Sequence, residues 1–250
     1  MKYFAFVLVA LAASARADRW PVDHVEVTST FAEPRADHFH NGLDMGGEQP
    51  VYPFRPGRLI YIRDAARHPF ENPLGPGNLV VMEHAGRVRT HYYHLADGTI
   101  RLDAIRNEDE PFARSGGTGH SMGAHLHFAV EDLTRRALLN PLDVLPRRAD
   151  RRRPSAVDIV LRRRERSEVE LRSTRVANVR AERAHLNQGF FPVRSGARVS
   201  GGDFEVFVKA YDIREGIPYF AKLGVYAFTL SFDGAVLRSY RFTELRKRRD

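Results

Sequence analysis

The chain has 250 residues, no cysteine and a formal net charge of +8. The absence of cysteine excludes disulfide staples and thiol chemistry of any kind, so stability must come from ordinary hydrophobic cores. A chain of this length can bury one or two such cores.

The first predicted element is a secretory signal over residues 1–17. It carries Lys2, an apolar run of roughly a dozen residues, and a small-x-small ending at Ala15 and Ala17. The run is too short to span a bilayer, and no later stretch is apolar enough to do so. We therefore expect cleavage after Ala17 and export to the periplasm, the cell envelope or the surroundings of a bacterium. A retained amphipathic anchor is the alternative.

Charge divides the rest of the chain into two predicted domains. Residues 18–146 contain 13 arginines against 18 acidic residues, a net charge of −5, whereas residues 147–250 contain 24 basic against 13 acidic residues, a net charge of +11. The proline-bounded stretch PRRADRRRP lies at the change. We interpret residues 147–155 as a basic linker between a domain over 18–146 and a second domain over 156–250, whose completeness the sequence leaves open.

The first domain is expected to be all-β and barrel-like, because short strand patterns alternate with turns and none shows a sustained helical period. The expected strands are Leu59–Arg63, Asn78–Glu83, Val88–His94 and His125–Glu131.

The second domain also alternates apolar and polar residues and predicts a β-sandwich of immunoglobulin-like type. The expected strands are Val157–Leu161, Val169–Leu171, Phe204–Lys209, Val225–Phe232 and Val236–Phe242. Its arginine runs suit an anionic envelope polymer or, alternatively, a solvated face. Export argues against nucleic acid as the partner.

The stretch HFHNGLDMGG places His40 and Asp44 four residues apart. Positions four apart on a strand face the same side, so an imidazole and a carboxylate can converge there. Ten of the eleven histidines lie at or before His127, so any imidazole chemistry belongs to the first domain.

The stretch THYYHLADG contains two further histidines, His91 and His94, which a regular strand would place on opposite faces. One of them at most would then enter a site, and a surface position is the alternative for each.

The stretch GAHLHFAV sets His125 and His127 on one face of a strand, with Leu126, Phe128 and Val130 on the other. Two surface histidines are the alternative. Together with His-x-x-x-Asp, this His-x-His pattern predicts a site of two histidines and one aspartate. Such a set suits Zn²⁺, and three protein ligands leave a fourth position for an activated water. A non-haem iron triad is a second interpretation.

The order of these motifs resembles the lysostaphin-type, or LytM-like, zinc metallopeptidases, which are peptidoglycan endopeptidases. The resemblance covers about half of the chain and rests on HNGLD at 40–44, VYPFRPG at 51–57, NLVVMEH at 78–84, YYHL at 92–95 and SGGTGHSMGAHLHFAVE at 115–131. It implies a LytM-like β-barrel or sandwich, the duplicated hybrid motif.

The resemblance further implies that one zinc ion is bound by His40, Asp44 and His127. It also implies that His94 and His125 are catalytic, with His125 as general base and His94 as the group that stabilises the oxyanion, although the two roles can be exchanged. The implied reaction is hydrolysis of cross-links or stem peptides of peptidoglycan; the sequence does not identify the bond. Some relatives lack ligands and only activate amidases. All five positions are filled in this chain, which favours an active enzyme.

Overall fold

The computed structural model describes residues 18–68, 75–103, 109–149, 154–163, 170–172, 179–183, 186–191, 204–213, 222–232 and 234–246. In this part of the chain the regular elements are strands, apart from one short 3₁₀ turn at Pro141–Asp143. The expectation of an all-β fold is therefore confirmed. The predicted signal over residues 1–17 lies outside the described residues. Among the residues searched, no helix has the length and apolar character needed to cross a membrane.

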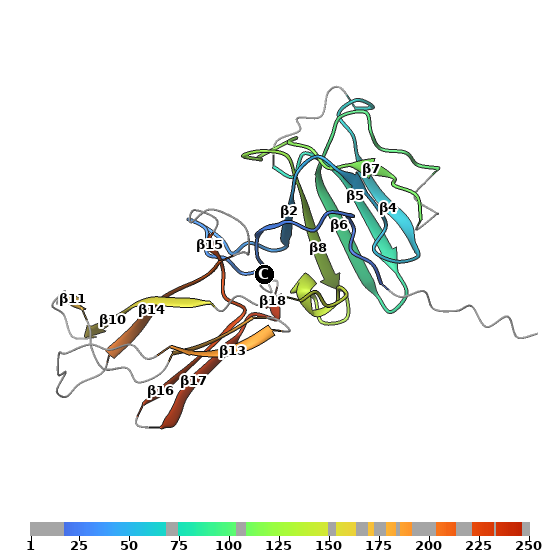
Figure 1. The fold of residues 1–250 in the computed structure, drawn as a ribbon. Helices are drawn as coiled ribbons and strands as arrows, with labels where there is room; N and C mark the ends of the chain where they lie inside the picture. Colours follow the sequence, from blue (N-terminus) through green and yellow to red (C-terminus); the bar gives the residue numbers. More distant parts are fainter. Residues whose placement is uncertain are drawn as a thin grey trace, which may run out of the picture.

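One large antiparallel sheet organises the first half of the chain (Figure 1). In spatial order its strands are β1 (Val27–Ser29), β2 (Leu43–Gly46), β8 (His125–Asp132), β6 (Val88–Leu95), β5 (Asn78–His84) and β4 (Gly57–Arg63). Strand β9 (Ala137–Leu139) pairs with β8, and β3 (Pro50–Val51) forms a separate ribbon with β7 (Ala113–Arg114). Four of these strands, β4, β5, β6 and β8, coincide with the sequence predictions and extend them by one or two residues.

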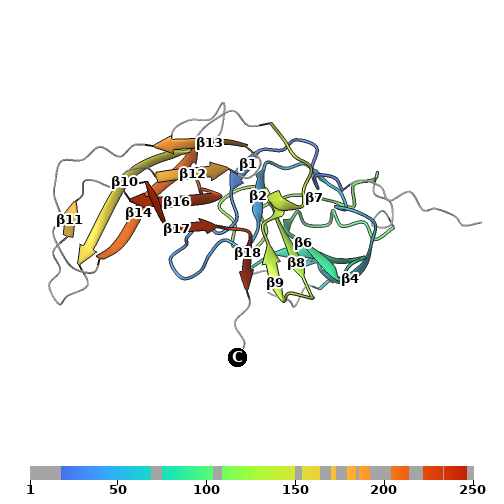
Figure 2. The ribbon, with the colours of Figure 1, turned by 90° about the horizontal axis from the view of Figure 1, so that it is seen from below.

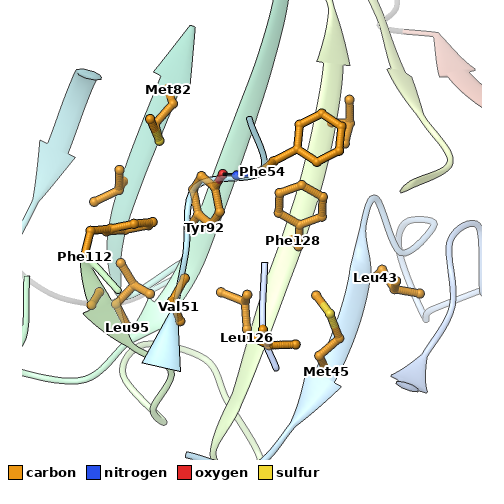
Figure 3. Packing of buried hydrophobic residues seen from close by; sticks show 14 of the residues in the cluster. Leu43, Met45, Val51, Phe54, Met82, Tyr92, Leu95, Phe112, Leu126 and Phe128 are labelled. Carbon is orange, nitrogen blue, oxygen red and sulfur yellow. Dashed lines mark hydrogen bonds between the residues drawn. The ribbon is translucent and has the colours of Figure 1, made fainter. Parts of the chain in front are cut away.

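The core lies against one face of this sheet, as Figure 3 shows. Strand alternation turns Leu126 and Phe128 of β8 toward it, beside Tyr92 of β6, and all three side chains are fully buried. The Tyr92 hydroxyl accepts a hydrogen bond from the backbone N–H of Phe54 (2.8 Å), so the ring is fixed inside the core. The opposite face of the same strands is therefore left for the polar side chains of the site.

The second half of the chain forms two four-stranded antiparallel sheets. The first has the order β11 (Glu170–Arg172), β10 (Ser155–Arg163), β14 (Phe204–Ile213) and β15 (Lys222–Leu223); the second has the order β13 (Leu186–Phe191), β12 (Val179–Arg183), β16 (Ala227–Phe232) and β17 (Ala235–Arg241). Two such sheets agree with a β-rich second domain. The immunoglobulin-like type and the boundaries of the domains stay predictions.

The two halves are joined through the last strand, β18 (Glu244–Arg246), which pairs with β9 and so extends the sheet of the first half (Figure 2). Side chains reinforce this junction. The Asn140 amide donates to the Phe242 carbonyl (2.8 Å), and the Tyr226 hydroxyl donates to Asp143 (2.7 Å). The second half is thus docked on the first by both backbone and side-chain hydrogen bonds.

Candidate metal centre

Three side chains converge on one point beside the sheet. His40 Nε2 lies 3.1 Å from Asp44 Oδ1 and 3.0 Å from His127 Nδ1, and His127 Nδ1 lies 2.9 Å from Asp44 Oδ1. The three atoms therefore form a nearly equilateral triangle of electron-pair donors, which is a group able to hold a metal ion. The structure brings together the three residues that the family resemblance implies as ligands.

Two of these residues are aligned by the sheet. Asp44 of β2 and His127 of β8 are direct cross-strand partners, so their side chains lie on the same face, away from the core. His40 precedes β2 and is not part of a strand. The convergence of His40 with Asp44 therefore comes from the loop before β2, and not from the four-residue spacing along one strand that the sequence suggested.

Gly42 allows this loop to approach β8. A Cβ atom at this position would lie 2.6 Å from both His127 Nε2 and the Phe128 carbonyl oxygen. Contacts this short are not tolerated between unbonded atoms. The glycine between His40 and Asp44 is thus required because the loop backbone packs directly on the His127 ring.

The orientation of the His40 ring is fixed by a backbone carbonyl. Its Nδ1–H donates to the Thr30 oxygen (2.8 Å), which leaves the Nε2 lone pair turned into the triangle. Such an outer hydrogen bond is typical of metal-binding histidines, because it sets the tautomer and the ring orientation.

The electrostatics of the triangle favour a negative Asp44 carboxylate beside a neutral His127 ring. Burial alone would raise the pKa of Asp44, but the close contacts with His127 and His40 outweigh it and hold this pKa well below its usual range. Burial lowers the pKa of His127 to about 4, although Asp44 opposes the shift. Asp44 is therefore ionised and His127 neutral near pH 7, the forms in which both groups bind metal.

The donor set fits zinc. A tetrahedral zinc ion with bonds of roughly 2.0–2.1 Å separates its ligand atoms by about 3.3 Å, close to the 2.9–3.1 Å edges of the triangle. In the neutral tautomer that the Thr30 carbonyl selects, His40 turns an electron pair toward the donor atoms of Asp44 and His127. A divalent cation satisfies this arrangement. Two imidazole nitrogens and one carboxylate oxygen also match the ligands of catalytic zinc sites.

His94 reaches the site through an irregularity in β6. The register of β6 with β5 shifts at this point, so that Tyr93 and His94 together oppose the single residue Leu79 in a β-bulge. His94 has a positive φ of 60°. The bulge breaks strict alternation, so these consecutive residues both approach His127, with ring centroids 5.1 Å and 6.1 Å away. His91 instead pairs with Glu131 (3.1 Å). Of the two histidines in this stretch, His94 is the one beside the triangle.

His125 lies next to His94, with ring centroids 4.7 Å apart, and its Nε2 is 3.7 Å from Asp44 Oδ1. Both rings are oriented by backbone carbonyls. His94 Nδ1 donates to the Thr118 oxygen and His125 Nδ1 to the Gly123 oxygen, each at 2.8 Å. In the neutral form of each ring, Nε2 is therefore the nitrogen without a proton. Burial lowers the pKa of His94, although the Thr118 carbonyl opposes the shift, which favours the neutral ring.

Sequence reasoning did not find the groups that orient these rings. The backbone carbonyls of Thr30, Thr118 and Gly123 carry no side-chain signature, and only the folded loops bring them to the histidines. Tyr93, which packs against the His127 ring, was detectable in principle, since it is the cross-strand partner of His127.

The site is a His-Asp-His group on a β-sheet that could hold a metal ion. Residues 38–141 match the family model of Peptidase family M23. The resemblance to lysostaphin-type peptidases is thereby confirmed for this part of the chain.

Known proteins are similar to part of this chain. Peptidoglycan DD-endopeptidase ShyB of Vibrio cholerae is 32% identical over 124 residues, which are 45% of this chain and 27% of ShyB. Peptidoglycan DD-endopeptidase ShyA of the same organism is 31% identical over 121 residues, 45% of this chain and 26% of ShyA. The crystal structure of a zinc-containing peptidase from Vibrio cholerae is 31% identical, with 46% of this chain and 37% of that chain covered and a TM-score of 0.38. The matched region thus spans about a quarter of the two curated relatives.

Proposed function

We propose that this chain is an exported zinc-dependent endopeptidase that hydrolyses peptide bonds of bacterial peptidoglycan. The observation that carries the proposal is the triangle of His40, Asp44 and His127 with the His94–His125 pair beside it. The names of the similar proteins, which are peptidoglycan DD-endopeptidases, support peptidoglycan as the substrate.

In this proposal the three triangle residues bind one zinc ion, which when bound polarises a peptide carbonyl and lowers the pKa of water. His125 accepts the proton of the attacking water at Nε2, because its Nδ1–H is held by the Gly123 carbonyl. His94, oriented in the same way by Thr118, stabilises the developing oxyanion. The two histidines are close enough to exchange these roles.

An inactive wall-binding regulator of an amidase is the competing function. Such a protein needs no complete metal centre and no catalytic pair. Here the three metal-binding atoms lie within 4.8 Å of one another, and the two additional histidines are held in matching tautomers. This degree of preorganisation supports an active enzyme over a binding protein.

The experiment is mass spectrometry of the fragments that the purified protein releases from peptidoglycan. D,D cross-links, the bonds named in the similar proteins, are the first substrate to test, and glycine-bridged or other stem peptides follow. We expect fragments that disappear with a zinc chelator and return with added zinc. This arm of the experiment requires no mutation.

A matched pair of variants completes the test. His127→Ala removes a buried ligand and is expected to abolish both turnover and stoichiometric zinc. His24→Ala changes a histidine of the same domain whose side chain is 81% exposed, and both properties should persist. Wall binding without fragments, insensitive to chelator, would overturn the proposal in favour of the regulator.

A further inference from the structure

The carboxylate of Glu33 lies at the centre of a hydrogen-bond cluster. Its Oε1 accepts from the backbone N–H and the hydroxyl of Thr30 (2.6 and 2.8 Å), and its Oε2 accepts from the Ser29 hydroxyl (2.6 Å). Arg35 adds an ion pair at 3.3 Å, and the Glu33 side chain is only 11% exposed. A buried carboxylate with several donors holds the surrounding backbone in one conformation.

The backbone that Glu33 holds also holds His40. The His40 N–H donates to the Glu33 carbonyl (2.8 Å), its carbonyl accepts from the Ala32 N–H (2.7 Å), and its ring donates to the Thr30 carbonyl (2.8 Å). His40 is therefore held by three hydrogen bonds to the turn formed by residues 30–33. A shift of this turn must change the direction of the His40 ring.

The second half of the chain reaches the same carboxylate. Gly224, directly after β15, donates its N–H to Glu33 Oε1 (2.9 Å), and its carbonyl oxygen lies 3.2 Å from the Thr30 hydroxyl. The fit is close, since a Cβ atom at Gly224 would lie 2.6 Å from Glu33 Cγ. One residue of the second half thus completes the cluster that fixes the turn before His40.

We propose that Glu33 is a positioning residue that couples the docking of the second half, through Gly224, to the geometry of the metal ligand His40. In this proposal the second half stabilises the geometry of the metal centre, in addition to any role in binding the wall. This inference rests on the metal centre of the proposed function and not on its substrate. Zinc affinity therefore tests it even if peptidoglycan is not cleaved.

Three variants distinguish coupling through Glu33 from a general effect of docking the second half. Gly224→Ala forces Glu33 to move, and Glu33→Gln replaces one acceptor oxygen with a donor; both should lower zinc affinity about tenfold, the lower range for groups that orient metal ligands. Tyr226→Phe is the control, because it removes the contact with Asp143 at the same junction and leaves Glu33 untouched. Affinity is measured on the full chain by chelator competition, with thermal unfolding of the metal-free form.

A second measurement uses the unmodified protein. Coupling is reciprocal, so zinc binding should slow hydrogen exchange of the Gly224 amide if that amide and His40 share one ordered turn. Full zinc affinity in Gly224→Ala, an equal loss in Tyr226→Phe, or exchange at Gly224 that does not respond to zinc would each overturn the proposal. If Gly224→Ala does not fold, the exchange experiment alone decides.

Discussion

Substitution of Gly42 by alanine tests whether the loop backbone sets the position of His127. The added Cβ would lie 2.6 Å from His127 Nε2 and from the Phe128 oxygen, and 2.9 Å from His127 Cε1. Ordinary contact needs about 3.5 Å, so a displacement of roughly 0.9 Å is required. The Phe128 residue is held in the ladder between β2 and β8, opposite Leu43. The strain must therefore pass to the loop or to the His127 ring.

Either displacement damages the metal centre. Metal sites tolerate changes of about 0.2 Å in ligand distance, several times less than the displacement expected. We expect zinc affinity to fall roughly 10- to 100-fold, which equals about 1.4–2.7 kcal/mol. Overpacking should also lower the free energy of unfolding of the metal-free protein by about 1–3 kcal/mol.

The assay is competition with a chelator of known zinc affinity, together with urea unfolding of the metal-free protein. Gly117→Ala is the matched control, because the nearest atom to its added Cβ lies 3.9 Å away. Wild-type zinc affinity in Gly42→Ala would refute the reasoning, since it would mean that the position of His127 does not depend on the loop.

Two further predictions concern His94 and His84. Asparagine is the substitution chosen for His94 because it tolerates the positive φ of 60°. His94→Asn should reduce turnover about 10²- to 10⁴-fold and change zinc affinity by no more than a few-fold. Unchanged turnover would contradict a catalytic role. Burial lowers the pKa of His84, which bonds to the Pro56 carbonyl and the Thr90 hydroxyl. The unfolded chain therefore takes up a proton first, and the free energy of unfolding should decrease as pH falls from about 6.5 through the folded pKa. Urea unfolding at pH 7 and pH 5.5 checks this, and His84→Gln should remove that part of the pH dependence.

Much of the sheet was predictable because its strands bury one face. Strict alternation in β8 places Leu126 and Phe128 in the core and His125 and His127 on the site face, as the sequence indicated. Pairing of β8 with β2 then brings Asp44 to His127. Period-two patterns carry this information locally, although the partner strand lies far away in the sequence.

The route of His94 into the site was not predictable in the same way. Regular alternation forbids consecutive residues such as Tyr93 and His94 from facing the same ring, and only the bulge opposite Leu79 permits it. Nothing in the apolar pattern marks a bulge, because it arises from a mismatch of pairing between two strands. The family resemblance, and not the strand pattern, pointed to His94.

The role predicted for the arginine runs of the second half is not tested by the structure. Most of their residues, including 150–153 and 247–250, lie outside the described part of the chain. Binding to an anionic envelope polymer therefore stays a prediction, which the salt dependence of binding to purified cell wall would test.

The three proposed ligands differ in what fixes them, and this difference has a consequence for the metal centre. Asp44 and His127 are direct partners in the β2–β8 ladder, so a register change that displaced one would displace both and would also break the core. His40 belongs to no strand and is held by the turn at residues 30–33. The backbones of the strand ligands can therefore shift only together with the sheet, whereas the backbone of His40 can shift while the sheet persists. A contact that moves the backbone of a ligand without unfolding the domain must act on His40, and Glu33 with Gly224 lies where such a contact is effective.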